Sequence, residues 1–438
     1  MDDEIVITGM GVVTPIGASV PEFWDANLTG RSGLRVEDRM DVSELPCGWV
    51  AGIIPEDTKK RLKAKWGRDG RSWGDILMHD ALDQALTDAG FDGPPGRRAG
   101  LVWARVWPGP SGSFPEDYVT HLKDMADRYH AVGNDPAGVV GYLKNRSLNL
   151  EAADLSAFPA EVSTRLGVPV LPVRLEATCA GGLRAIAEAA RLLRTGKVDV
   201  AVVTASVSRN TPYVLSQYGQ LMALSRWKGA PEQSSMPFDK RRSGMVINES
   251  AGALVLETAE HARRRGVVET HAVIGGWGLA VDTEHLTAPS VHAVERVIRA
   301  ALADSESTVD DIDVVNAHGT STKLNDVTEA RALHRVFGER METLDVCAVK
   351  SLTGHGSAAS GLVESVVSAL TLSEGLVPPV VTCTEPDPAC GVKTSLSPVR
   401  LPARKVLKNS FGFGGQYASM VFERPDRPRR LAGTVAVG

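Results

Sequence analysis

One cysteine stands where a strand is expected to turn sharply into a helix. Before Cys179, apolar residues of the stretch 173–177 alternate with charged or polar ones, which is typical of a strand. After it, apolar residues recur at helical spacing until Thr195-Gly196-Lys197, where the helix should end. A thiol at such a turn would face unpaired backbone N–H groups and the positive end of the helix dipole, which both favour the reactive thiolate. The same N–H groups could stabilise an oxyanion on an attacked thioester.

This stretch alone does not establish a nucleophile, because free cysteines are often buried and pack as small hydrophobes. The elements that could complete a site recur later in the chain. The stretch 346–351 is again a strand, followed by a Gly-rich turn with His355 and an amphipathic helix, like the Cys179 unit. A second Gly-rich loop, at 314–326, carries His318. If the two strand–turn–helix units are equivalent, a twofold relation would bring their helix starts together at the centre.

The chain repeats its order of elements, which indicates a divergent duplication. The buried strand and Gly-rich turn at 4–17 are echoed at 270–278, and strand 199–206 completes a βαβ unit after the Cys179 helix. We therefore divide the chain into residues 1–260, with Cys179, and residues 261–424, with both histidines. Residues 425–438 are rich in Pro and Arg and are expected to be a disordered tail.

Composition excludes several classes of protein. The 438 residues, 43% of them hydrophobic, suit one large domain or two fused halves. We find no apolar run long enough to cross a membrane and no signal peptide. The five cysteines are scattered, odd in number and lack CxxC pairs, so we expect a reduced cytoplasmic protein with neither disulfides nor a zinc site. A net charge of -5 gives no general attraction to nucleic acid.

Against this mild acidity, the stretch 58–73 is strongly basic. Its basic residues are Lys59, Lys60, Arg61, Lys63, Lys65, Arg68 and Arg71. Such a run is either a solvated helix face or a docking patch for an acidic partner.

Four motifs in order resemble the β-ketoacyl synthases, the condensing enzymes of fatty acid and polyketide assembly. They are Cys179 at its turn, His318-Gly319-Thr320-Ser321-Thr322, Lys350-Ser351 with Gly354-His355, and Phe411-Gly412-Phe413-Gly414-Gly415. The resemblance covers about residues 5–423 and is to the elongating Cys-His-His class. It implies an α/β, thiolase-like fold, with duplicated βαβ halves in a five-layer α-β-α-β-α arrangement. The length, without a fused acyltransferase or carrier, suggests a type II system.

The resemblance implies an acyltransferase reaction in two halves. Cys179 would accept an acyl chain from a carrier-protein thioester, with the backbone N–H groups of Cys179 and Phe413 stabilising the oxyanion. A malonyl-type extender would then lose carbon dioxide, and His318 and His355 would hydrogen-bond the enolate oxygen. The carbanion would attack the acyl-Cys179 carbonyl. No metal, nucleotide or redox cofactor is expected, since the phosphopantetheine arm arrives on the carrier.

Other roles follow from the same resemblance. Lys350 and Glu329 match positions that form an ion pair beside the histidines. Thr320 and Thr322 match contacts to the phosphopantetheine arm, although hydrogen bonding within the loop is the alternative. Phe413 matches a gate that swings as the acyl chain enters. The motif around it also places Phe411 and Gly414 among the substrate-binding residues.

Several positions depart from the family pattern. Met245, Asn248 and Ser250 replace a Phe and two Gly, and Tyr417 stands where Asn is common. A strand end that usually carries small glycines holds Trp103, Arg105 and Trp107. These bulky residues could shorten or reshape the acyl pocket. The departures favour a specialised, polyketide-like biosynthesis over housekeeping fatty acid synthesis.

Two other functions stay open. The first is a synthase-like acyltransferase that passes the acyl group to an oxygen, nitrogen or other carbon nucleophile. The second is a partner subunit that only sets chain length. The expected partner is an acidic acyl carrier protein, docked on the basic stretch. We expect a homodimer, with a heterodimer containing a chain-length-factor-like paralogue as the alternative, and neither a nucleic acid nor a membrane partner.

Overall fold

The computed structural model describes residues 4–39, 47–68, 71–91, 98–104, 157–208 and 212–431. Ten strands form one sheet in the order β10-β9-β13-β14-β8-β1-β7-β6-β4-β5. Their bounds are β1 (Ile5–Val13), β4 (Ala99–Ala104), β5 (Val170–Leu175), β6 (Val200–Ser208), β7 (Glu249–Thr258), β8 (Ala272–Val281), β9 (Val314–Asn316), β10 (Asp345–Cys347), β13 (Lys405–Gly412) and β14 (Gln416–Glu423). Two small antiparallel pairs are β2 (Leu34–Val36) with β3 (Val50–Gly52) and β11 (Leu376–Val377) with β12 (Val399–Arg400).

The sheet consists of two halves with the same topology. In the first half β5, β4 and β6 are parallel neighbours, and β7 and β1 follow antiparallel. In the second half β10, β9 and β13 are parallel, and β14 and β8 follow antiparallel. The halves join where Ile5, Val6 and Ile7 of β1 pair with β8. The structure thus contains the duplication that the recurring strand patterns indicate.

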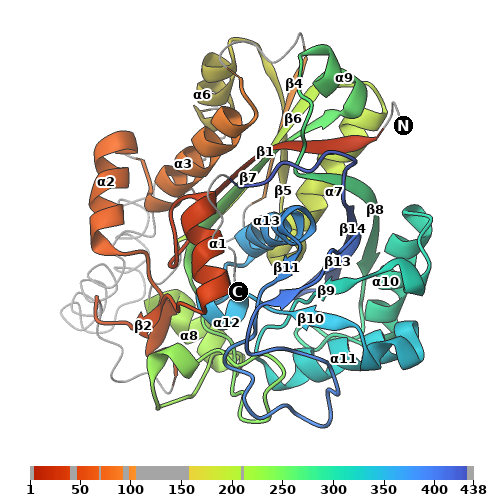
Figure 1. The fold of residues 1–438 in the computed structure, drawn as a ribbon. Coiled ribbons are helices and arrows are strands. Elements are labelled where there is room, and N and C mark those ends of the chain that lie inside the picture. Colours follow the sequence, from red (N-terminus) through yellow and green to blue (C-terminus); the bar gives the residue numbers. More distant parts are fainter. Residues whose placement is uncertain are drawn as a thin grey trace, which may run out of the picture.

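Helices complete five layers (Figure 1). The helices are α1 (Val20–Thr29), α2 (Glu56–Trp66), α3 (Trp73–Asp88), α6 (Ala157–Leu166), α7 (Gly181–Arg194), α8 (Pro212–Gln220), α9 (Ala259–Arg264), α10 (Val291–Asp304), α11 (Lys323–Phe337), α12 (Lys350–Thr353) and α13 (Ala358–Glu374). Helices α3 and α6 share a core with one face of the first half-sheet, and α10 and α11 share one with the second. Helices α7 and α13 lie between the halves, in a core to which both contribute. This arrangement confirms the predicted five-layer, thiolase-like α/β fold.

Small residues let the two central helices touch backbone to backbone. A Cβ added to Gly182 of α7 would lie 2.6 Å from the Ala358 oxygen and 2.8 Å from the Leu362 nitrogen of α13. Gly361 of α13 meets Gly182 in the same way. This close approach brings together the starts of α7 and α13, and with them Cys179 and His355.

The C-terminal region departs from expectation. Residues 425–431, predicted to be disordered, instead lie against the body of the protein. Arg429 donates to the Asp88 carbonyl at 2.6 Å, and the Leu431 N–H donates to Glu374 at 2.8 Å. Composition suggested disorder, but these residues gain long-range hydrogen bonds that composition does not reveal. The remaining residues, 432–438, lie outside the described residues.

No helix in the described part of the chain combines the length and the apolar character that crossing a bilayer requires.

Candidate active site

Cys179 sits in a one-turn 3-10 helix, Thr178–Ala180, between β5 and α7, as the sequence predicts. Thr178 has a positive φ of 43°, a strained conformation that sharpens the turn. Its hydroxyl donates to the Phe413 carbonyl at 3.0 Å. A Cβ on Gly412 would lie 2.0 Å from the Thr178 hydroxyl oxygen, so only glycine fits there. The cysteine turn is therefore locked against the second half's loop at 411–415.

His355 lies between α12 and α13, and its imidazole ring contacts the Cys179 thiol. The distance from His355 Nε2 to Cys179 Sγ is 3.0 Å. Its backbone N–H donates to the Val246 carbonyl at 2.6 Å, and its carbonyl accepts from Asn248 at 3.2 Å. The segment that precedes β7 thus holds the backbone of His355 through both its N–H and its carbonyl.

His318 follows β9 and completes the group. Its ring centroid lies 5.4 Å from that of His355 and 5.5 Å from that of Phe411, both edge to face. The backbone N–H groups of His318 and Gly319 donate to the two oxygens of Glu329, at 2.8 and 2.9 Å. Glu329 therefore fixes the loop that carries His318.

The predicted ion pair between Lys350 and Glu329 is wrong. Lys350 Nζ pairs with Glu364 at 2.6 Å and donates to the His318 carbonyl at 2.6 Å. The carboxylate of Glu329 instead accepts hydrogen bonds from two backbone amides and from the Asn409 side chain. Glu364 lies on α13, where its helix position brings it under Lys350, whereas Glu329 on α11 is turned to the loop.

A second buried lysine, which sequence reasoning missed, meets the same carboxylate. Lys408 Nζ lies 2.6 Å from the other oxygen of Glu364, and all three side chains are buried. A sequence signal existed for Glu364, which stands between apolar pairs in the stretch 362–367, where a charge is unexpected. The signal for Lys408 was weaker, because apolar residues precede it but Asn409 and Ser410 follow it. The site thus rests on a Lys–Glu–Lys cluster with one excess positive charge.

Electrostatics hold all three central side chains neutral. Burial raises the pKa of the Cys179 thiol to about 11, although Lys350, the Ser357 hydroxyl and the Phe413 backbone act against it. Burial and the charge of Lys350 lower the pKa of His355 and of His318 well below the usual value. The sequence-based expectation of a resting thiolate is therefore wrong, since desolvation outweighs the turn's N–H groups.

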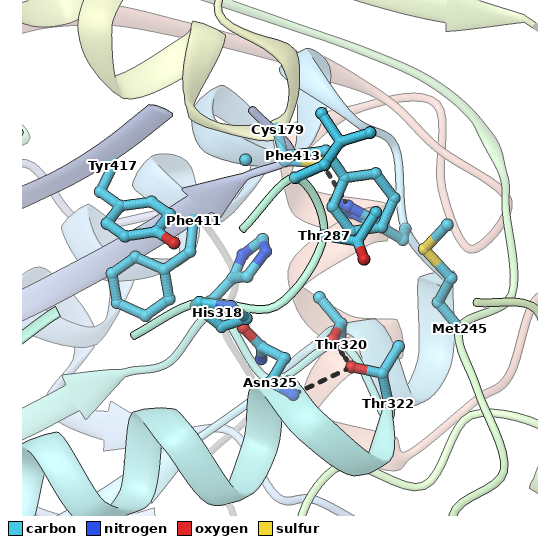
Figure 2. A pocket seen from close by; sticks show the side chains of 14 residues that line it. Cys179, Met245, Thr287, His318, Thr320, Thr322, Asn325, Phe411, Phe413 and Tyr417 are labelled. Atoms are coloured by element: carbon cyan, nitrogen blue, oxygen red, sulfur yellow. Dashed lines mark hydrogen bonds between the residues drawn. The ribbon is translucent and has the colours of Figure 1, made fainter. Parts of the chain in front are cut away.

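The group lies in a pocket (Figure 2). Its lining is Cys179, Met245, Leu286, Thr287, Pro289, His318, Thr320, Thr322, Asn325, His355, Phe411, Gly412, Phe413 and Tyr417. Thr320, Thr322, Phe411 and Phe413 thus lie where predicted. The Thr320 and Thr322 hydroxyls are 3.0 Å apart, and Thr322 also caps α11 by accepting from Asn325 N at 3.3 Å. Both hydroxyls bond within the loop and still face the pocket.

Other predicted pocket residues lie elsewhere. Trp103 alternates to the outer face of β4, where its buried ring packs edge to face on Phe158 at 6.0 Å. Its small neighbour Ala104 faces the central layer instead. Gly414 donates its N–H to the Leu286 carbonyl at 2.7 Å and is absent from the lining. Arg105 and Trp107 lie outside the described residues.

The residues that depart from the family pattern support the site. The Asn248 amide donates to the Thr353 and Gly354 carbonyls at 2.9 and 3.2 Å, just before His355. The Ser250 hydroxyl in turn donates to the side-chain oxygen Oδ1 of Asn248 at 2.9 Å. Tyr417 packs edge to face on Phe411 and donates to Asp282 at 3.1 Å. These hydrogen bonds fix the His355 turn and the wall behind His318.

The basic stretch forms α2 and the residues after it. Lys60, Arg61, Lys63 and Arg68 are exposed, whereas Leu62 is buried and anchors the helix. Lys65 pairs with Asp80 and Asp83, at 3.0 and 2.7 Å. Lys59 is half-buried, with its ammonium 5.5 Å from the centre of the Trp73 ring. Of the six predicted docking residues, four therefore have neither an ion pair nor a cation–π contact with another described residue: Lys60, Arg61, Lys63 and Arg68.

Within the described ranges, one group of side chains could hold a metal ion. The ligand atoms of Cys179, His318 and His355 all lie within 4.8 Å of one another. The same three residues are those that the sequence assigns to acyl transfer.

Comparisons with known proteins agree with this geometry. Residues 2–262 match the N-terminal domain of beta-ketoacyl synthases and residues 271–384 the C-terminal domain. The chain is 30% identical, over 96% of its length and 98% of the relative's, to 3-oxoacyl-[acyl-carrier-protein] synthase 2 of Coxiella burnetii.

Two solved structures share the fold along nearly their whole length. A type II polyketide ketosynthase, in complex with its acyl-carrier protein and bound to the hexaketide, has a TM-score of 0.81 and 26% identity, covering 97% of this chain and 100% of that one. The ishigamide ketosynthase/chain length factor has a TM-score of 0.80 and 28% identity, covering 96% and 99%. Both domains match in order, and each half brings its own part of the cysteine–histidine group to their junction: the chain belongs to the beta-ketoacyl synthase family.

Proposed function

We propose that the protein is a β-ketoacyl-[acyl-carrier-protein] synthase that condenses a Cys179-bound acyl chain with a malonyl-type extender. One observation carries the proposal. Cys179 Sγ lies 3.0 Å from His355 Nε2, and the His318 ring lies beside both, at a pocket whose lining includes two threonine hydroxyls. This is a nucleophile next to two hydrogen-bonding imidazoles, which acyl transfer followed by enolate formation requires.

In the first step the Cys179 sulfur attacks the carbonyl of an acyl-carrier thioester. The bond from the carbonyl to Cys179 forms and the bond to the carrier sulfur breaks, so the thiol proton ends on the released carrier thiol. Since burial keeps Cys179 protonated at rest, this proton leaves during the transfer. The backbone N–H of Phe413, which acts on the thiol, is placed to stabilise the oxyanion with that of Cys179.

In the second step the extender loses carbon dioxide and becomes an enolate. Low pKa values keep the His318 and His355 rings neutral, and a neutral imidazole carries one N–H that can be donated to the thioester oxygen. The enolate carbon then attacks the acyl-Cys179 carbonyl, the sulfur leaves, and a proton from solvent restores the thiol. Fixed donors of this kind contribute roughly 10²–10³ each to such rates. The proposed reaction uses no resident metal or cofactor.

Partners follow from the surface. The exposed Lys60, Arg61, Lys63 and Arg68 support docking of an acidic carrier beside α2. The outer edge of β5 pairs with no other strand in the described ranges, and its Leu171 is 44% exposed. Such an edge favours strand pairing with a second subunit, and we propose a homodimer. If the purified protein sediments at twice the 46.6 kDa chain mass, the homodimer is supported. If the protein sediments as a monomer alone and as a dimer only after a paralogue is added, the heterodimer is favoured.

The pocket supports a specialised pathway. Met245 and Tyr417, both unusual for the family, line it directly, and Tyr417 is held by Asp282. We therefore place the enzyme in a type II, polyketide-like biosynthesis. The five free cysteines support a reducing compartment, the cytoplasm.

Intact-protein mass after mixing with acyl-carrier and malonyl-carrier proteins tests the proposal. We expect an acyl adduct on the wild type and on Cys347→Ala, a matched buried cysteine, but none on Cys179→Ala. A β-keto chain two carbons longer should then appear on the carrier. An adduct without extension or carbon dioxide would instead indicate transfer to another nucleophile, and no adduct would indicate a chain-length-setting subunit.

A further inference from the structure

The histidine beside the nucleophile has a side-chain partner that the mechanism above does not use. Ser360, in the first turn of α13, is buried, and its hydroxyl oxygen lies 3.2 Å from His355 Nδ1. The Gly356 N–H donates to the same oxygen at 2.8 Å. One serine therefore joins the backbone of the His355 turn to the ring nitrogen opposite Cys179.

Two proton arrangements fit these distances. In the first, the Ser360 O–H donates to Nδ1, and the ring proton sits on Nε2, facing Cys179. In the second, Nδ1–H donates to Ser360, and Nε2 is bare and accepts from the thiol. Because the ring is buried and neutral, it carries one proton and must adopt one arrangement or the other.

The hydroxyl proton decides between them. A serine oxygen has two lone pairs and one proton, and the Gly356 N–H already occupies one lone pair. In the second arrangement the ring occupies the other, and the buried hydroxyl proton is left without a hydrogen-bond acceptor among the described residues. The first arrangement leaves only a thiol proton unpaired, and thiols are weak donors, so it costs less.

We propose that Ser360 is a positioning residue that holds the proton of His355 on Nε2, where it can be donated to the reacting thioester oxygen. The proposal rests on the condensing function. The tautomer is fixed by a hydroxyl in the first turn of α13, which accepts a hydrogen bond from the backbone of the turn that carries the histidine. A tautomer fixed before substrate binds makes the donor ready without rearrangement.

Ring ¹⁵N NMR of histidine-labelled protein reads the tautomer directly, and His355→Asn identifies the signals. We expect the wild type to show a protonated Nε2 and a bare Nδ1. Ser360→Ala should shift the pair toward Nδ1–H, and Ser360→Thr should keep the wild-type pattern. Ser365→Ala is the matched control, since Ser365 is also buried on α13 but donates only to the Gly361 carbonyl, at 2.6 Å.

Kinetics give the second readout. Ser360→Ala should lower kcat for malonyl decarboxylation about tenfold, which corresponds to the free energy of one neutral hydrogen bond. The KM for the extender should change little. The threonine variant should recover the rate. A bare Nε2 in the wild type, or an unchanged tautomer in Ser360→Ala, would overturn the proposal. If the expected tautomers appear but the wild type releases no carbon dioxide, the proposed function fails instead and the role of Ser360 in the tautomer stands.

Discussion

Lys408 and Glu364 form a buried ion pair, with Nζ 2.6 Å from Oε2, behind the histidines of the site. The other oxygen of Glu364 pairs with Lys350 at 2.6 Å. One carboxylate therefore neutralises one of two ammonium groups, and the remaining positive charge acts on the site. Both lysines lower the pKa values of His318 and His355.

Lys408→Met should make the enzyme more sensitive to acid. A histidine whose pKa lies well below its usual value stays neutral as pH falls, and removing a nearby positive charge raises that pKa. The acid limb of the kcat/KM profile should therefore move to higher pH, by about one unit. Lys405→Met, on the same strand but paired with Glu423 at the surface, should leave the limb in place. An unshifted limb in Lys408→Met would show that this lysine does not control the histidines.

Alkylation of Cys179 should rise steadily with pH. The pKa of the Cys179 thiol is raised to about 11, so the thiolate fraction is small at neutral pH and increases with every unit of pH. The iodoacetamide rate should increase between roughly pH 7 and pH 10 without a plateau. Cys179→Ala supplies the background from the other four cysteines, which are all buried. A plateau near neutral pH would mean that the turn stabilises the thiolate more than burial opposes it.

Gly182→Ala should weaken the junction of the two halves. The new methyl would meet the backbone of α13, which cannot move away as a flexible side chain could. We expect a loss of about 1–3 kcal/mol in the free energy of unfolding and reduced acylation of Cys179, measured by calorimetry and intact mass. Arg191→Ala, at an exposed position of the same helix, should change stability little. Wild-type stability in Gly182→Ala would contradict the contact.

Lys60→Glu with Arg61→Glu should weaken carrier docking selectively. An exposed ion pair contributes up to about 1 kcal/mol, so two reversals should raise the KM for carrier-bound malonate about tenfold. The effect should shrink at high salt. A malonyl-pantetheine thioester without carrier should react as before, and Arg331→Glu on α11 is a control at another exposed arginine. Equal losses with and without the carrier would argue against docking at α2.

Local patterns predicted the parts of the fold that local forces determine. The strand–turn–helix unit at Cys179 follows from side-chain spacing, and its repetition predicted that His355 would lie beside it. Which carboxylate meets Lys350 depends on the packing of α11 and α13, which spacing does not show. Trp103 and its small neighbour Ala104 point to opposite faces of β4, and the sequence does not show which of the two faces the core between the halves. Likewise, the depth of burial that sets the Cys179 pKa exists only in the folded protein.

The central claim is that His318 and His355 turn a carrier-bound malonate into a carbon nucleophile for acyl-Cys179. Release of labelled carbon dioxide from malonyl-carrier by the pre-acylated enzyme tests it most directly. We predict one carbon dioxide for each β-keto chain in the wild type, and a loss of roughly 10²–10³ in rate for His318→Ala and for His355→Ala with Cys179 acylation retained. Carbon dioxide release at wild-type rates in either variant, or none from the acylated wild type, would contradict the account.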